Sequence, residues 1–106
     1  MAHRPARTKA DVFSAIRQHQ SRIRQFGVKR LGLVGSFRHG AQTKDSDVDL
    51  IVEFEAGNKT FDNFIGLAYF LEDVLQRKVE LLTPESLSPY LREPLLKEVE
   101  YAPVTA

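Results

Sequence analysis

Two aspartates at the start of an apolar segment constrain this chain more than any other feature of its sequence. The segment 47–55 reads Asp-Val-Asp-Leu-Ile-Val-Glu-Phe-Glu, which predicts a β-strand with alternating faces. Asp47 and Asp49 are two residues apart, so their carboxylates share one face, while Val48 and Leu50 point into a core. Adjacent carboxylates repel each other unless a cation lies between them, and oxygen ligands on a rigid strand suit Mg²⁺. The segment therefore predicts a candidate metal site on a half-buried strand.

A glycine and a serine follow the preceding apolar run, Leu31 to Val34. Gly35 lets the backbone approach a ligand closely, and Ser36 can begin a short helical turn. The free amides of that turn and the Ser36 hydroxyl are suited to hold phosphate oxygens. One strand end thus offers a phosphate cradle and the next offers a metal clamp, which together predict a site for a nucleoside triphosphate.

A third carboxylate, Glu80, extends the candidate site. It lies in the apolar run Lys78 to Leu82, and both of its immediate neighbours alternate into the core. We expect Glu80 to face Asp47 and Asp49 from another strand. Three carboxylates on one face are the donor set of a two-metal site.

Apolar periodicity along the chain predicts a single α/β domain in which helices cover a small sheet. Thr8 and Asp11 resemble a capping box at the start of the first helix, and Gly27 stops that helix. The expected elements are a helix over about Lys9–Gln25, strands over Leu31–Val34 and Asp47–Glu55, a helix over about Phe61–Gln76, a strand over Lys78–Leu82 and a helix over Pro89–Glu98. The domain covers residues 1–106, with a core at about 8–101 and flexible termini. The tail from Glu100 is expected to be extended or disordered.

Composition excludes several classes of protein. The chain has no cysteine, which excludes a disulfide framework, a thiolate zinc site and a cysteine nucleophile. No apolar run approaches a membrane span, and the basic N-terminus lacks the apolar core of a secretion signal, so we expect a cytoplasmic protein. Residues 1–30 hold eight Lys or Arg and one acid, whereas residues 31–106 hold seven bases and thirteen acids. The basic part fits a solvated helix face first and a polyanion-binding surface second.

The spacing of these motifs resembles a known family. Gly35-Ser36, the pair Asp47 and Asp49 and a downstream acid on another strand are similar to the signature of polymerase-β-type nucleotidyltransferases. The runs 45–54, 59–64, 77–83 and 87–90 further resemble the minimal nucleotidyltransferases, and the likeness covers residues 28–101. It implies a mixed-sheet fold and Mg²⁺-dependent transfer of a nucleoside monophosphate from a nucleoside triphosphate. Many members are antitoxins paired with HEPN-type ribonuclease toxins, and some add AMP to a tyrosine of that partner.

The resemblance also implies roles for individual residues. Gly35 and Ser36 would hold the triphosphate, Asp47 and Asp49 would bind both metal ions, and Glu80 would bind the second metal and act on the attacking hydroxyl. Two positions depart from the family pattern. The third acid is usually Asp, and here it is the longer Glu80. The position before Gly40 is often Arg and here is His, so Arg38 becomes the candidate phosphate contact.

Three functions fit the sequence. The first is an enzyme that uses ATP and two Mg²⁺ ions to move AMP onto a hydroxyl of a partner protein, such as the tyrosine of a HEPN-type toxin. Because the chain holds little beyond the nucleotide half-site, we expect a partner or a second copy to supply the acceptor. The second is an antitoxin that neutralises its partner by contact alone, with a vestigial nucleotide site. The third is nucleic-acid binding through the basic first thirty residues, ranked last because no base-reading motif is visible.

Overall fold

A four-stranded mixed sheet forms the centre of the protein in a computed structural model that describes residues 4–102. The strands are β1 (Val28–Val34), β2 (Val48–Phe54), β3 (Val79–Leu82) and β4 (Glu100–Ala102), and their order across the sheet is β3-β2-β1-β4. β1 pairs antiparallel with both β2 and β4, whereas β2 and β3 are parallel. The parallel pair requires a crossover connection, and the long helix α4 (Phe61–Leu75) provides it.

The other helices are α1 (Lys9–Gln18), α2 (Gln20–Gln25), α3 (Gly35–His39) and α5 (Pro89–Glu98), with a short 3₁₀ turn η1 at Pro84–Ser86. The capping box predicted for the first helix is present, because the Thr8 hydroxyl accepts from the Asp11 amide and the Asp11 carboxylate accepts from the Thr8 amide. Among the described residues, no helix is long and apolar enough to cross a membrane.

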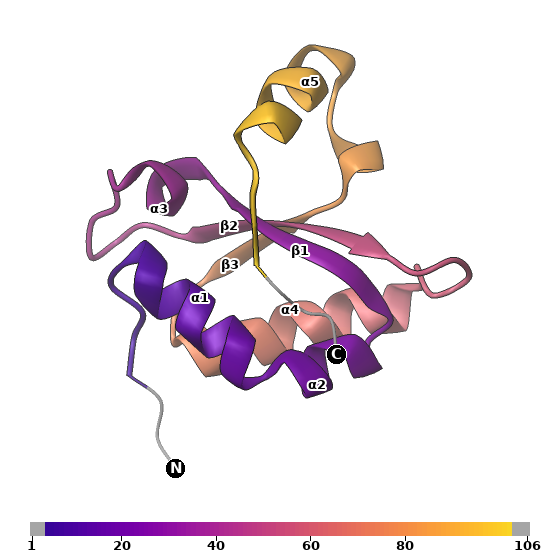
Figure 1. The fold of residues 1–106 in the computed structure, drawn as a ribbon, viewed down its shortest axis with the longest axis horizontal. Coiled ribbons are helices and arrows are strands. Elements are labelled where there is room, and N and C mark those ends of the chain that lie inside the picture. The colour runs from indigo at the N-terminus through magenta and orange to yellow at the C-terminus, as the bar shows by residue number, and fades with distance from the viewer. Residues whose placement is uncertain (1–3, 103–106) are drawn as a thin grey trace.

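The two faces of the sheet are covered differently. In Figure 1, α1, α2 and α4 lie together below the sheet, while α5 stands above it on a separate arm. The lower face holds the main core, where Val48, Leu50 and Val52 of β2 have no exposed surface. The upper face holds only a small cluster around Val34 and Ile51, and no residue of α5 itself is buried. The upper face is therefore covered around Ile51, whereas Asp49 is partly exposed and Glu80 is exposed.

The predicted bounds of the first helix and of the first strand were wrong. The expected helix Lys9–Gln25 is two helices, because His19 leaves the helical conformation at φ −113° and ψ 19°. The first strand begins at Val28 rather than Leu31. The tail from Glu100 is extended, as one of the two predicted options, but it also pairs with β1 as a fourth strand. A three-residue strand has too little local pattern to be predicted, and its hydrogen bonds with β1 define it.

Gly32 makes room for this C-terminal segment. A Cβ at Gly32 would lie 2.2 Å from a Val99 methyl group and 3.1 Å from the Tyr101 ring. The absence of a side chain in the middle of β1 therefore lets the side chains of Val99 and Tyr101 pack against Gly32 where β4 pairs with β1. Glu100, between Val99 and Tyr101, lies 3.5 Å from Arg38 of α3, so this packing also bears on the turn that follows β1.

We predict that Gly32→Ala lowers the free energy of unfolding by about 1–3 kcal/mol, because the added methyl group overpacks this contact. Urea unfolding followed by circular dichroism measures the change. The double variant Gly32→Ala, Val99→Ala should lose less stability than the sum of its two single variants, because the shortened Val99 leaves room for the methyl group. Strict additivity would contradict the packing explanation.

Candidate functional site

Three of the predicted site residues lie in a row across the sheet. β1 and β2 place Val34 opposite Asp49, so that Gly35 follows directly beside Asp49 at the end of β1. β2 and β3 place Asp49 opposite Glu80. The backbone pairing thus puts Gly35, Asp49 and Glu80 next to one another on adjacent strands, although they are distant in the sequence.

Gly35 is held closely against Asp49. Its backbone φ is +75°, which residues other than glycine rarely adopt. A Cβ at this position would lie 2.2 Å from the Asp49 Oδ2 atom. Only glycine fits both the backbone angle and the space. The turn that follows continues into α3, and the Ser36 side chain is partly exposed there. The expected short helical turn is present, but it begins at Gly35 with Val34 as its N-cap, so the prediction that Ser36 begins it was wrong.

The electrostatic environment of Asp49 is unfavourable for a charge. Burial first, and then the negative charges of Glu80 and Asp47, together raise the pKa of its carboxyl to about 6. Asp47 and Glu80 are themselves exposed, Asp47 just before β2 and Glu80 within β3. The three acids are therefore near enough to repel one another with no cation to offset the repulsion.

This donor set has the chemistry that Mg²⁺ requires, since all its ligands are carboxylate oxygens. Within residues 4–102, however, no three Asp, Glu or His side chains converge to hold a metal ion in their present positions. Asp49 and Glu80 nevertheless lie close enough for their carboxyl groups to share a hydrogen bond. Their roles as metal ligands remain predictions.

Arg38 has partners other than a phosphate. Its Nε donates to the Glu98 carbonyl at 2.8 Å and lies 3.5 Å from the Glu100 carboxylate. The next residue, His39, has its Nε2 2.9 Å from the Glu98 carboxylate. These contacts join α3 to the junction of α5 and β4. In this structure the Nε atom of Arg38 faces Glu98 and Glu100, and a phosphate contact by Arg38 stays a prediction.

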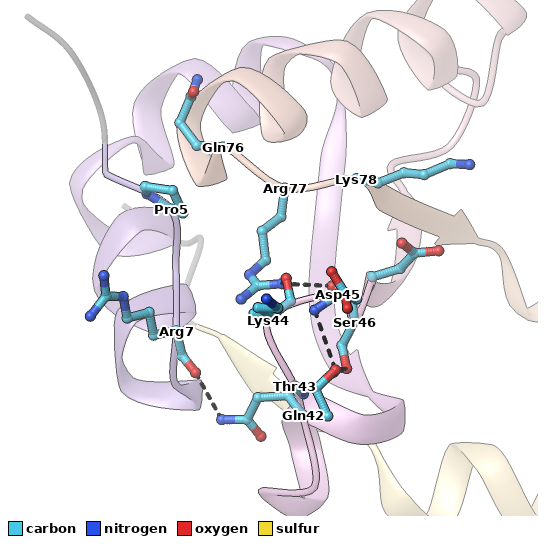
Figure 2. A pocket seen from close by; sticks show the side chains of 11 residues that line it. Pro5, Arg7, Gln42, Thr43, Lys44, Asp45, Ser46, Gln76, Arg77 and Lys78 are labelled. Atoms are coloured by element: carbon cyan, nitrogen blue, oxygen red, sulfur yellow. Dashed lines mark hydrogen bonds between the residues drawn. The ribbon is translucent and has the colours of Figure 1, made fainter.

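A hollow of about 630 Å³ adjoins the row at one end. Asp47 lies on its wall together with neighbouring side chains of both signs, and Figure 2 shows Arg77 crossing it towards the loop that precedes β2. The predicted residues Gly35, Asp49 and Glu80 do not line it. The hollow therefore lies beside Asp47 and outside the row of Gly35, Asp49 and Glu80. We place the candidate chemistry at that row, where the acids and the glycine meet.

Sequence interpretation assigned no role to Arg77, which lies between α4 and β3. Its guanidinium contacts three backbone carbonyls and one aromatic ring. The sequence carries no periodic signal for such a residue, because its partners are backbone atoms of two distant segments and an aromatic ring of a third.

Comparisons with known proteins show the family of this chain. The model of the nucleotidyltransferase domain family matches residues 16–102. Protein adenylyltransferase MntA of Thermococcus cleftensis is 35% identical over 89% of this chain and 95% of its own length. A Methanocaldococcus jannaschii protein, named provisionally as a protein adenylyltransferase, is 32% identical over 90% of this chain and 98% of its own.

Solved structures share the fold. One that is described provisionally as a minimal nucleotidyltransferase is 30% identical, covers 83% of this chain and 93% of its own, and has a TM-score of 0.69. Another, a toxin–antitoxin crystallised with AMP-PNP, has a TM-score of 0.61 at 22% identity over 88% of this chain and 70% of its own. The small mixed sheet with flanking helices is thus the minimal nucleotidyltransferase fold.

We predict that the metal-free protein loses stability as pH rises from about 4 through about 6. The pKa of the Asp49 carboxyl is about 6 in the folded state against an ordinary value of 3.8, so the folded state binds the proton more tightly than the unfolded state does. Asp49→Asn should remove this loss and be more stable than wild type at pH 8 in EDTA. The gain should be of the order of 1 kcal/mol, after allowing for the exposed part of the carboxyl. Asp45→Asn, in the exposed loop, is the matched control.

Adding Mg²⁺ at pH 8 should then raise the thermal midpoint of wild type and leave that of Asp49→Asn nearly unchanged, because a ligand stabilises only the state that binds it. Differential scanning fluorimetry measures both shifts. An Asp49→Asn variant that is less stable than wild type at pH 8 in EDTA would show that the carboxyl is favourably paired, contrary to the repulsion described here.

Proposed function

The chain belongs to the nucleotidyltransferase domain family, and from that membership we propose that it transfers AMP from ATP to a hydroxyl group of a partner protein. The observation that carries the proposal is the row of Gly35, Asp49 and Glu80 across three strands, with Asp49 filling the space where a side chain at position 35 would lie. This places a narrow backbone turn beside a cluster of carboxylates. A triphosphate with its cations needs both.

In this proposal the Gly35-Ser36 turn binds the β- and γ-phosphates through backbone amides and the Ser36 hydroxyl. Asp47, Asp49 and Glu80 would hold two Mg²⁺ ions, whose positive charge would offset the negative charge of the phosphates. The acceptor oxygen forms a bond to the α-phosphorus as the bond from the α-phosphorus to the bridging oxygen breaks, releasing pyrophosphate. Glu80 accepts the proton of the attacking hydroxyl.

The Thermococcus relative supports ATP as the nucleotide and a protein as the acceptor, because it is named a protein adenylyltransferase. This chain aligns with 95% of that relative's length. A HEPN-type toxin with an acceptor tyrosine is the partner that the sequence resemblance implies. In the described part of the chain, Asp47 and Glu80 are exposed and Asp49 is partly exposed, which gives a partner residue access to the acids.

A second function, neutralisation by contact alone, is favoured by one feature. α5 buries none of its residues, and its large side chains Tyr90 and Leu91 are 91% and 60% exposed. Leu95, Leu96 and Val99 instead pack partly against the small upper cluster. A protruding helix with exposed aromatic and aliphatic side chains is suited to contact another protein without any chemistry at the carboxylates.

We predict that Asp47→Asn and Asp49→Asn each reduce AMP transfer by at least about 100-fold, because each loses one carboxylate that would hold the metal ions. The protein is incubated with its copurified partner, Mg²⁺ and ATP, and the intact mass of the partner is recorded. Wild type should add whole AMP units, and Asp45→Asn, an exposed acid of the same loop, should behave like wild type.

Unimpaired transfer by both Asp variants would show that the carboxylates are not the site. Neutralisation of the partner that persists in these variants, with no mass gain in wild type, would instead establish the contact-only antitoxin. Other nucleoside triphosphates in the same assay test the choice of adenine.

A further inference from the structure

Arg77 connects segments that are far apart in the sequence. It precedes β3 and reaches across the hollow beside Asp47 (Figure 2). Its Nη1 donates to the carbonyls of Lys44 and Ser46, each at 2.9 Å, and its Nε donates to the Ala6 carbonyl. One side chain thus joins the N-terminal segment, the loop before β2 and the start of β3.

The same guanidinium lies over the ring of Phe37, 5.1 Å from its centroid. Phe37 is completely buried in α3 and follows Gly35-Ser36 directly. Within the described residues, no carboxylate forms an ion pair with Arg77, so carbonyl oxygens and an aromatic face stabilise its charge. The guanidinium is therefore oriented by backbone groups, and in turn it orients them.

Both halves of the candidate site meet at this side chain. Ser46, whose carbonyl accepts from Arg77, immediately precedes Asp47, while Phe37 immediately follows the proposed phosphate turn. We propose that Arg77 is a positioning residue for nucleotidyl transfer, which holds Asp47 in place relative to the Gly35-Ser36 turn. This inference rests on the proposed function, because it assigns Arg77 a task in that same site.

Arg77 acts beside other contacts, because β1 pairs with β2 and the Ala41 amide donates to the Ser36 carbonyl at 2.9 Å. The loop before β2 closes on itself, since the Thr43 amide donates to the Ser46 hydroxyl at 2.8 Å and the Ser46 amide donates to the Thr43 carbonyl at 3.1 Å. The Val48 amide donates to the Lys78 carbonyl at 2.9 Å and fixes the start of β2. Of these contacts, only that of Arg77 joins the closed turn to the ring beneath the phosphate turn.

Lysine cannot replace this arginine. A guanidinium is flat and presents several donors in a fixed fork, so it can bond carbonyls in its plane and rest on an aromatic face at once. An ammonium group on a flexible stem keeps the positive charge but loses that geometry. Arg77→Lys therefore tests orientation at constant charge.

The matched control is Arg22→Lys. Arg22 also lies over an aromatic ring, 5.0 Å from the centroid of Phe26, and bonds Gln25, but it belongs to α2 under the opposite face of the sheet. Hydrogen–deuterium exchange of metal-free protein, the affinity for Mn²⁺ as a probe ion, and the steady-state constants of AMP transfer are measured for wild type and both variants.

We expect Arg77→Lys to speed exchange at the amides of residues 43–46, to weaken Mn²⁺ binding roughly tenfold and to lower kcat about 100-fold, with little change in KM for ATP. Arg22→Lys should match wild type in all three. Faster exchange in Arg77→Lys with unchanged Mn²⁺ affinity would overturn the proposal, because Arg77 would then only stabilise the loop. Unchanged exchange at residues 43–46 would overturn it too.

The failure of the proposed function gives a different pattern. If wild type transfers no AMP, exchange and Mn²⁺ affinity still decide whether Arg77 positions Asp47. If Asp47→Asn abolishes transfer while Arg77→Lys transfers like wild type, the proposed function stands and the role of Arg77 is overturned.

Discussion

The contact between Gly35 and Asp49 is the constraint on which the candidate site depends. The carboxylate of Asp49 occupies the space in which any other residue at position 35 would place its Cβ, and the backbone of Gly35 has a positive φ. The end of β1 can therefore turn sharply towards α3 while it stays against β2. Without this contact, the turn and the acids would be separate features on two strand ends.

The sheet makes this contact possible because one of its faces packs against the main core and the other carries the acids. Val48, Leu50 and Val52 pack completely against the helices below and keep β2 rigid. The alternate residues of the same strand face the thinly covered upper side, where Asp49 carries a pKa raised to about 6. Apolar burial on one face thus holds a repulsive group of charges on the other, and a bound cation would relieve that repulsion.

Several polar contacts outside the row support its geometry. Arg38 and His39 join α3 to the chain around β4, and Arg77 joins the loop before β2 to the ring beneath the phosphate turn. These side chains bond backbone carbonyls or partly exposed acids, so each contributes modestly to stability. Their combined effect is to fix the position of α3 and of the segment before Asp47 relative to the sheet.

The sequence by itself determined the family, the α/β class and the parity of the acids on β2, because alternation along a strand is a local property that Asp47, Val48 and Asp49 express directly. It also contained the Thr8 capping box, whose partners are three residues apart. Only the tertiary structure decided that Asp49 lies opposite Glu80 and beside Gly35, that residues 100–102 form a strand, and that Arg38 turns to Glu98 and Glu100. It also decided the contacts of Arg77. These features depend on strand register and on backbone carbonyls of distant segments, which local residue patterns do not encode.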